Sequence, residues 1–138
     1  MTNNNEMIQK MVDEALEARL NAYVPYSNFK VGAAVLTKDG KIFRGCNIEN
    51  ASYGLCNCAE RTALFKVYSE GYKKDDIVMM SVSGDTKNPI SPCGACRQVM
   101  NELLHKDTPV ILTNNKKDVY KTTVKDLLPY SFDEVEND

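Results

Sequence analysis

Apolar side chains follow two different periods along the chain, and each period predicts a different kind of element. Residues 6–20 carry apolar side chains at positions 7, 8, 11, 12, 15 and 16, the spacing that gives a helix one apolar face. Residues 31–37 form a continuous run of small and β-branched residues, which is typical of a buried strand. Lys38-Asp39-Gly40-Lys41 follows, and Asp-Gly at its centre predicts a tight turn into a returning strand.

The same patterns predict the order of the remaining elements. Strands are predicted at residues 31–37, 41–47, 76–83, 108–113 and 119–122. Helices are predicted at residues 6–20, 57–70, 93–104 and 124–128. A hairpin followed by alternating strands and helices predicts a mixed sheet with helices packed on it, an α/β layered domain. At 138 residues, the chain is expected to form one domain that spans residues 1–138.

Composition and charge narrow the class of function. The chain is 43% hydrophobic and 26% charged, with a net charge of -2 and with Lys and Arg spread along the sequence. Nucleic-acid binding needs clustered basic residues, so we expect no nucleic acid partner and favour a small-molecule substrate. No apolar run approaches the roughly 20 residues of a membrane span, so no membrane partner is expected. The polar N-terminus lacks the pattern of a signal peptide, and we therefore expect a cytoplasmic protein.

Five cysteines and a single histidine determine which metal chemistry is available. Because five is an odd number, the cysteines cannot all pair in internal disulfides. In a reducing compartment thiols more often serve metal sites or catalysis. His105 is the only histidine, so a metal site with several protein ligands must use sulfur or oxygen.

Two short motifs together have the composition of a catalytic zinc site, namely Cys58-Ala59-Glu60 and Pro92-Cys93-Gly94-Ala95-Cys96. Three thiols supply three ligands, a fourth position stays open for water, and Glu60 is a candidate acid/base beside them. Zinc nucleobase deaminases carry the signature H-x-E followed by P-C-x-x-C, with a three-cysteine variant. The order of residues here matches that variant, with Cys58 in the histidine position.

The predicted helices bear on the charge of this site. Cys58 falls in the first turn of one predicted helix, and Cys93 and Cys96 fall in the first turn of another, where free N–H groups and the helix dipole favour thiolates. Zn²⁺ with three thiolates has the formal charge +2 − 3 = −1, which opposes the acidification of a bound water. We therefore expect Arg61, three residues after Cys58, to donate hydrogen bonds to the ligand sulfurs. The alternative for Arg61 is an exposed helix side chain.

The remaining assignments also have structural alternatives. Asn57-x-x-Glu60 resembles a capping box, in which the Glu side chain caps the start of its own helix. Cys56 could be the fourth ligand of a closed structural zinc site, although the single residue before Cys58 is shorter than the usual spacing. The C-x-x-C pair could be a thioredoxin-like redox pair, which leaves Cys58 and Glu60 unexplained.

Over nearly its whole length the chain resembles the short, three-cysteine, homotetrameric cytidine deaminases. The resemblance is carried by Pro25-Tyr26-Ser27, Phe29, Val31-Gly32-Ala33-Ala34, Gly45-Cys46-Asn47-Ile48-Glu49-Asn50-Ala51, Cys58-Ala59-Glu60-Arg61-Thr62-Ala63, Ser91-Pro92-Cys93-Gly94-Ala95-Cys96-Arg97-Gln98 and Leu127-Leu128-Pro129. It implies a three-layer α/β/α fold around a five-stranded mixed sheet. It also implies one Zn²⁺ per subunit on Cys58, Cys93 and Cys96, and a homotetramer whose sites are completed by neighbouring subunits.

The resemblance further implies an activity, the hydrolysis of cytidine and deoxycytidine to uridine and deoxyuridine plus ammonia in pyrimidine nucleoside salvage. A zinc-bound hydroxide would attack C4 of the base while Glu60 shuttles protons. Substrate contacts are implied for the side chains of Asn47 and Glu49 on the ribose hydroxyls, the backbone N–H of Ala59 on the pyrimidine O2, and Phe29 against the base. Tyr53 and Phe132 match aromatic residues that complete the site of a neighbouring subunit.

From the residues alone, several of these roles stay open. Asn47 could be a turn residue, Glu49 a solvated side chain and Phe29 a part of the core. Two alternative functions also stay open. One is a deaminase of another aminated base or of a nucleoside-like antibiotic, and the other is a zinc-stabilised binding module without turnover.

Overall fold

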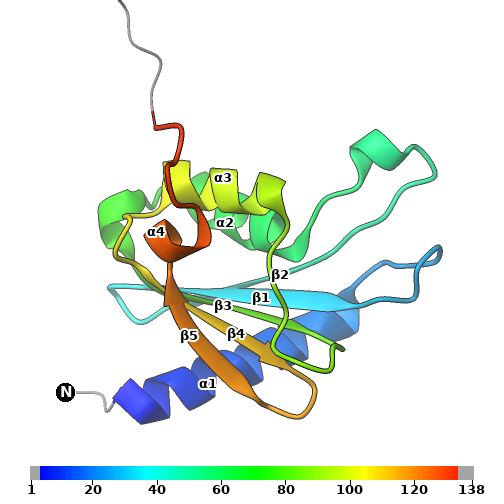
Figure 1. The fold of residues 1–138 in the computed structure, drawn as a ribbon, viewed down its shortest axis with the longest axis horizontal. Helices are drawn as coiled ribbons and strands as arrows, with labels where there is room; N and C mark the ends of the chain where they lie inside the picture. Colours follow the sequence, from blue (N-terminus) through cyan, green and yellow to red (C-terminus); the bar gives the residue numbers. More distant parts are fainter. Residues whose placement is uncertain (1–3, 134–138) are drawn as a thin grey trace, which may run out of the picture.

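The computed structural model describes residues 4–133, and a five-stranded mixed sheet lies at its centre (Figure 1). The strands are β1 Val31–Thr37, β2 Ile42–Cys46, β3 Ile77–Gly84, β4 Pro109–Asn114 and β5 Val119–Thr123. Their order across the sheet is β2-β1-β3-β4-β5. Strands β3 and β4 are parallel, whereas the other neighbouring pairs are antiparallel. The predicted hairpin at Asp39-Gly40 joins β1 to β2.

Helices cover both faces of the sheet, so the fold has three layers (Figure 1). Helix α1, Asn4–Ala18, packs on one face, where its apolar stripe meets Ala34, Leu36, Met79 and Ile111. Helices α2, Ala59–Ser69, and α3, Gly94–Leu103, lie on the opposite face with the short α4, Val124–Leu127. This arrangement confirms the predicted α/β class with its five-stranded mixed sheet.

Strand β1 shows why a continuous apolar run predicts a central strand. All seven of its residues are buried, because helices cover both of its faces. Strand β5, at the edge of the sheet, is exposed over its first three residues.

Glycine allows helix α2 to approach the sheet closely. A Cβ at Gly45 of β2 would lie 2.4 Å from the backbone N of Ala63 and 2.7 Å from the carbonyl O of Ala59. Only a residue without a side chain fits this contact. Gly45 therefore determines how closely the first turn of α2 packs on the sheet, and with it the position of residues 58–60.

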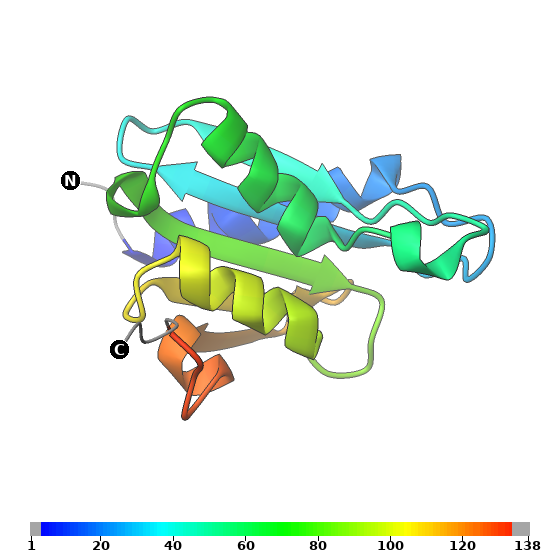
Figure 2. The same cartoon turned by 90° about the horizontal axis from the view of Figure 1, so that it is seen from above.

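Helices α2 and α3 lie side by side and begin at the same end of the sheet (Figure 2). Strand β3 also ends there, and residues 85–93 run from it to the start of α3 without forming a helix or a strand. The starts of the two helices and the end of β3 thus place residues 58–60 and 90–96 near one another.

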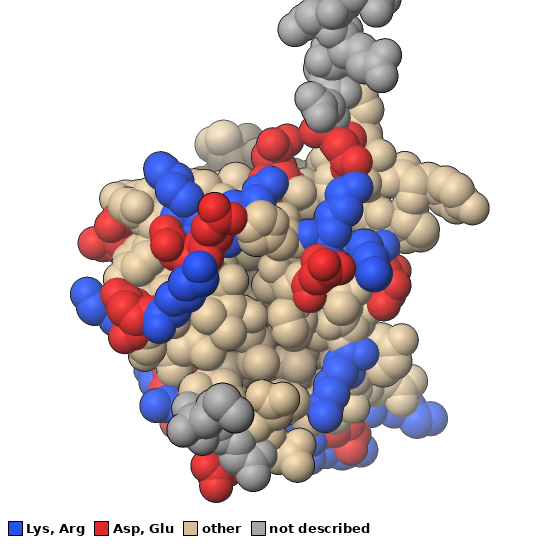
Figure 3. All heavy atoms as spheres, turned by 90° about the vertical axis from the view of Figure 1, so that its left-hand side faces the viewer, with Lys and Arg blue, Asp and Glu red and all other residues tan. Residues whose placement is uncertain are grey.

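Charge is mixed on the face of the molecule shown in Figure 3, where Lys and Arg side chains are interspersed with Asp and Glu. Within residues 4–133, no helix combines the length and the apolar character that crossing a bilayer requires.

Candidate active site

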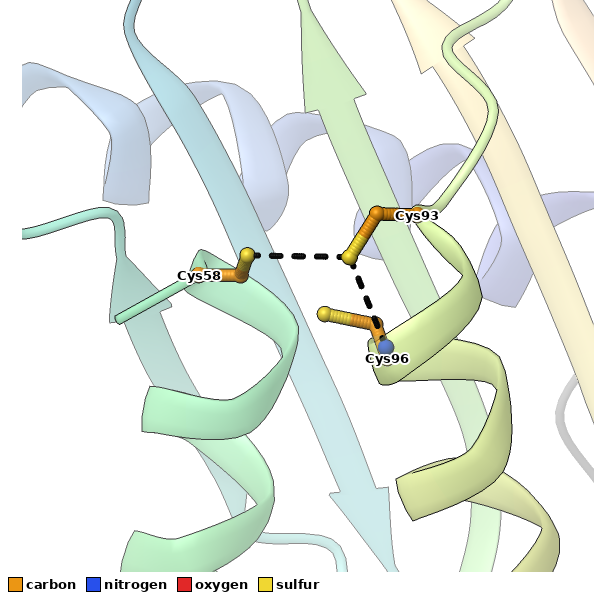
Figure 4. A group of neighbouring side chains, drawn as sticks. All are labelled: Cys58, Cys93 and Cys96. Carbon is orange, nitrogen blue, oxygen red and sulfur yellow. Dashed lines mark hydrogen bonds between the residues drawn. The ribbon is translucent and has the colours of Figure 1, made fainter. Parts of the chain in front are cut away.

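The three predicted thiol ligands meet where α2 and α3 begin (Figure 4). The Sγ atoms of Cys58, Cys93 and Cys96 all lie within 4.8 Å of one another, and those of Cys58 and Cys93 are 3.8 Å apart. Tetrahedral zinc with bonds of about 2.3 Å to sulfur places its sulfurs about 3.8 Å apart. The thiols therefore fit a zinc ion, and among residues 4–133 they are the one group of three or more potential ligands close enough to hold a metal.

The two helices begin later than the sequence pattern predicts, because Cys58 and Cys93 are N-cap residues with extended backbone. The placement of these two cysteines in the first helical turn was therefore wrong, whereas Cys96 does lie in the first turn of α3. The N-cap position keeps both sulfurs at the positive end of a helix dipole. The Sγ of Cys93 also accepts a hydrogen bond from the backbone N–H of Cys96, at 3.4 Å.

Arg61 lies in the first turn of α2 and contacts a ligand sulfur. Its Nη2 donates to the Sγ of Cys58 at 3.2 Å, and the side chain is half-buried. Arg61 is therefore not the exposed helix residue of the alternative interpretation. The neighbouring Cys96 thiol, followed by the Arg61 guanidinium, lowers the pKa of Cys58 to about 5. A low pKa favours the thiolate, which is the form that binds a metal.

Glu60 does not form a capping box with Asn57. The N-cap of α2 is Cys58, and no side-chain cap hydrogen bond forms there, so the capping-box alternative is wrong. The Asn57 side chain donates instead to the Oγ1 of Thr62 at 3.0 Å. The Glu60 side chain is 4% exposed, and this burial raises the pKa of its carboxyl group. A raised pKa suits a carboxyl group that must both accept and return a proton near neutral pH.

A cavity of about 240 Å³ opens beside Glu60 and the thiols. Its lining consists of Phe29, Val31, Asn47, Cys58, Ala59, Glu60, Ile90, Ser91 and Cys93. Sequence reasoning gave no substrate-binding role to Val31, Ile90 or Ser91, although Val31 and Ser91 stand in segments that carry the resemblance. A larger cavity of about 550 Å³ lies over β5 and α4 and contains neither the thiols nor Glu60.

The Asn47 side chain binds the backbone of two other residues that line this cavity. Its Oδ1 accepts a hydrogen bond from the backbone N–H of Val31, and its Nδ2 donates to the carbonyl of Phe29, both at 2.9 Å. An amide side chain has two donor hydrogens and two acceptor lone pairs, so one of each stays available to a ligand. Phe29 is 36% exposed and lines the cavity, which excludes the alternative of a fully buried core residue.

Three predicted substrate contacts lie outside this cavity in a single chain. The Glu49 carboxylate accepts hydrogen bonds from the Ser27 hydroxyl and from the backbone N–H groups of Tyr26 and Ser27. These bonds, that of the hydroxyl foremost, lower the pKa of Glu49. Glu49 and Tyr53 line a separate cavity of about 340 Å³, and Phe132 is 65% exposed.

Cys56 is not a fourth ligand of this group. Its Sγ accepts a hydrogen bond from the backbone N–H of Asn50 at 3.3 Å and lies 3.6 Å from the Asn50 carbonyl O. The closed four-thiol site is therefore wrong. A redox pair of Cys93 and Cys96 does not account for the third thiol. The Sγ of Cys58 lies close enough to both of their Sγ atoms for the three to share one metal ion.

Comparisons with known proteins agree with this geometry. The profile of the cytidine and deoxycytidylate deaminase zinc-binding region matches residues 5–112. A cytidine deaminase of Halalkalibacterium halodurans is 60% identical over 124 residues, which cover 90% of this chain and 92% of that protein. A cytidine deaminase of Sporosarcina psychrophila is 52% identical over 125 residues, which cover 91% of this chain and 90% of that protein.

Solved structures give the same result. The crystal structure of cytidine deaminase from Burkholderia pseudomallei has a TM-score of 0.89 and 55% identity, and the match covers 96% of this chain and 100% of that one. That of cytidine deaminase from Mycobacterium tuberculosis has a TM-score of 0.76 and 34% identity, with 95% and 98% covered. Together with the thiol cluster, these matches confirm the predicted fold and the predicted zinc cofactor.

Proposed function

The chain belongs to the cytidine and deoxycytidylate deaminase family, and we propose that it hydrolyses cytidine and deoxycytidine to uridine and deoxyuridine with release of ammonia. One observation carries the proposal beyond family membership. Glu60, a buried acid, lines the same cavity as two of the three thiols of the zinc site. A base that enters this cavity therefore meets a proton-transfer group and a metal site together.

The zinc site and Glu60 divide the chemistry between them. Bound zinc supplies a water acidified enough to react near neutral pH. Glu60 would accept a proton from the attacking water and deliver it to N3 of the pyrimidine. It would then accept the remaining proton of the new C4 hydroxyl group and deliver it to the departing amine. Its burial supports this role, because the raised pKa keeps the protonated form accessible during the cycle.

Other residues of the cavity lining orient the substrate in this proposal. Phe29 presents an apolar ring to the base, and Ala59 lies at the start of α2, where backbone N–H groups are free to bind the pyrimidine O2. Asn47 offers the remaining donor and acceptor of its amide to a ribose hydroxyl. These contacts suit either sugar, so they support both cytidine and deoxycytidine as substrates.

Residues from neighbouring subunits complete the site in this proposal. Tyr53 is 90% exposed and Phe132 65% exposed, and neither lines the cavity of its own chain. Tyr and Phe are enriched at protein–protein interfaces, so these exposed aromatic side chains support coverage by a partner subunit. We place Tyr53 and Phe132 at sites shared within a homotetramer, whereas the Glu49 carboxylate is proposed, with Asn47, to bind the ribose hydroxyls. Sedimentation equilibrium should give the mass of four chains, and a monomer at micromolar concentration would contradict this assembly.

The proposed setting is pyrimidine nucleoside salvage in the cytoplasm. The thiol cluster supports this compartment, because the cysteines are free and the three of the metal group must stay reduced to bind zinc.

A spectrophotometric assay tests the proposed function. Added cytidine should lose ultraviolet absorbance as it is deaminated, and a zinc chelator should abolish the change. Activity on another aminated base with none on cytidine would favour the alternative of a deaminase with a different substrate. Bound zinc with no turnover on any amine would favour a binding module.

Arg61 supports a prediction of its own. We expect Arg61→Gln to lower kcat about 10- to 100-fold, the usual effect of losing a group that hydrogen-bonds a metal ligand. The physical reason is the lost positive charge beside the Cys58 thiolate. Steady-state kinetics and the thermal midpoint, measured together, should show activity falling much more than stability.

The matched control for Arg61 is Arg44→Gln, which removes a guanidinium paired with Glu14 of α1, on the opposite face of the sheet from the thiols. Turnover of Arg61→Gln equal to that of this control would contradict the proposed role.

A further inference from the structure

The segment that carries Cys93 to the zinc site has little regular structure of its own. Residues 85–93 form neither helix nor strand, yet they supply Ile90, Ser91 and Cys93 to the cavity. Its contacts with the sheet lie before Ser91, where the N–H of Ile90 donates to the carbonyl of Thr113 at 3.1 Å, the Asn114 side chain donates to the carbonyl of Lys87 at 3.1 Å, and the N–H of Thr86 donates to the carbonyl of Gly84 at 3.0 Å. A ligand on such a segment keeps its position only if other groups hold the chain.

Arg97, one turn into α3, holds the end of this segment with its side chain. Its Nε donates to the carbonyl of Pro92 at 2.8 Å, and its Nη2 donates to the Oγ of Ser91 at 2.5 Å. Its backbone N–H donates to the carbonyl of Cys93 at 3.0 Å. One residue therefore fixes the chain directly before and directly after the Cα of Cys93.

The third guanidinium nitrogen of Arg97 extends this connection to α4. Nη1 donates to the carbonyl of Leu127 at 2.9 Å. Leu127 is the last residue of α4, where carbonyl groups lack partners within the helix. The planar guanidinium can hold three acceptors at fixed relative positions, which a lysine ammonium on a flexible stem cannot do.

We propose that Arg97 is a positioning residue of the zinc site, which holds Cys93 where its sulfur can share a metal with Cys58 and Cys96. Arg97 touches neither the metal ligands' sulfurs nor the cavity itself, since it contacts carbonyl and hydroxyl oxygens and is absent from the cavity lining. It thus differs from Arg61, which donates directly to a ligand sulfur. Arg61 adjusts the charge of the site, whereas Arg97 sets its geometry.

The test compares Arg97→Met, which keeps the length of the side chain but removes its donors, with Arg44→Met as the matched control. Zinc release into a chromophoric chelator should be about 10- to 100-fold faster in Arg97→Met than in Arg44→Met. The absorption spectrum of the Co²⁺-substituted protein should also shift, because it reports the geometry of the thiolate ligands. On cytidine, kcat should fall by a larger factor than KM rises, since Phe29 and Asn47 stay in place.

Two further variants keep the test decisive if Arg97→Met does not fold. Ser91→Ala removes a single acceptor of the guanidinium and should accelerate zinc release about threefold, in the same direction, as expected for the loss of one hydrogen bond. Arg97→Lys should restore only part of the wild-type behaviour, because it replaces a three-way contact with a single charge.

Zinc release and a Co²⁺ spectrum that match the Arg44→Met control in every folded Arg97 and Ser91 variant would overturn the proposal. A lower thermal midpoint with unchanged zinc release would overturn it as well, because it would assign Arg97 to stability alone. The turnover readout rests on the proposed function, whereas zinc release does not. A wild-type protein that binds zinc but leaves cytidine unchanged would therefore refute the proposed function and leave the inference on Arg97 to be decided by zinc release.

Discussion

Glu60→Gln is expected to bind zinc as the wild type does and to lose about 10²- to 10⁴-fold in kcat on cytidine, the usual contribution of a general acid/base. The substitution keeps the shape of the side chain and its capacity to form hydrogen bonds, but it removes the group that takes up and returns a proton. Glu60 is 4% exposed and lines the cavity beside Cys58 and Cys93. Among residues 4–133, no other carboxyl group lines that cavity, so none is placed to replace it.

The choice of glutamine separates catalysis from helix capping. Glutamine serves as well as glutamate in a capping box, so a purely structural Glu60 would tolerate this change. Zinc content and kcat should be measured beside Glu70→Gln, which alters an exposed carboxylate at the end of the same helix. Undiminished turnover of Glu60→Gln would remove Glu60 from the mechanism.

The start of α2 shows why some helix boundaries escape sequence reasoning. Asn57 is a better N-cap than Cys58 by intrinsic preference, and the helix was therefore predicted to begin there. The structure uses the backbone of Asn57 elsewhere, since its N–H and carbonyl both pair with Ile48. A contact with a residue nine positions earlier thus moves the helix start to Cys58, and the sequence around Asn57 contains no signal of that contact.

In the candidate site, too, short motifs predict some residues, whereas contacts between distant parts of the chain place others. The spacing of the cysteines and Glu60 was sufficient to predict the metal ligands and the acid beside them, because both motifs are short and lie at helix starts. Ile90 and Ser91 were not predicted to line the cavity, because residues of other elements fix the path of their loop. Thr113 of β4 binds the backbone of Ile90, and Arg97 of α3 binds the side chain of Ser91. Glu49, Tyr53 and Phe132 could be named only by resemblance, since nothing within one chain brings them to the cavity.

Cys96→Ser is expected to lower zinc affinity by more than about 100-fold, because the loss of a ligand exceeds the 10- to 100-fold effect of losing an outer partner. Zinc prefers thiolate to a neutral hydroxyl, and the Cys96 side chain is fully buried, so no water can easily take its place. Activity on cytidine should fall to background at ordinary zinc concentrations. Added zinc should raise the thermal midpoint of the wild type and not that of the variant, because only a bound ligand stabilises the folded state.

Cys56→Ser is the matched control for this prediction, since it makes the same chemical change two residues before a ligand. Cys56 contacts Asn50 and lies outside the thiol group, so the zinc affinity of Cys56→Ser should equal that of the wild type. A closed structural site would behave in the opposite way, because all four thiols would then hold the metal and no position would remain for water. Equal loss of zinc in Cys56→Ser and Cys96→Ser would therefore contradict the open three-thiol site on which the proposed chemistry depends.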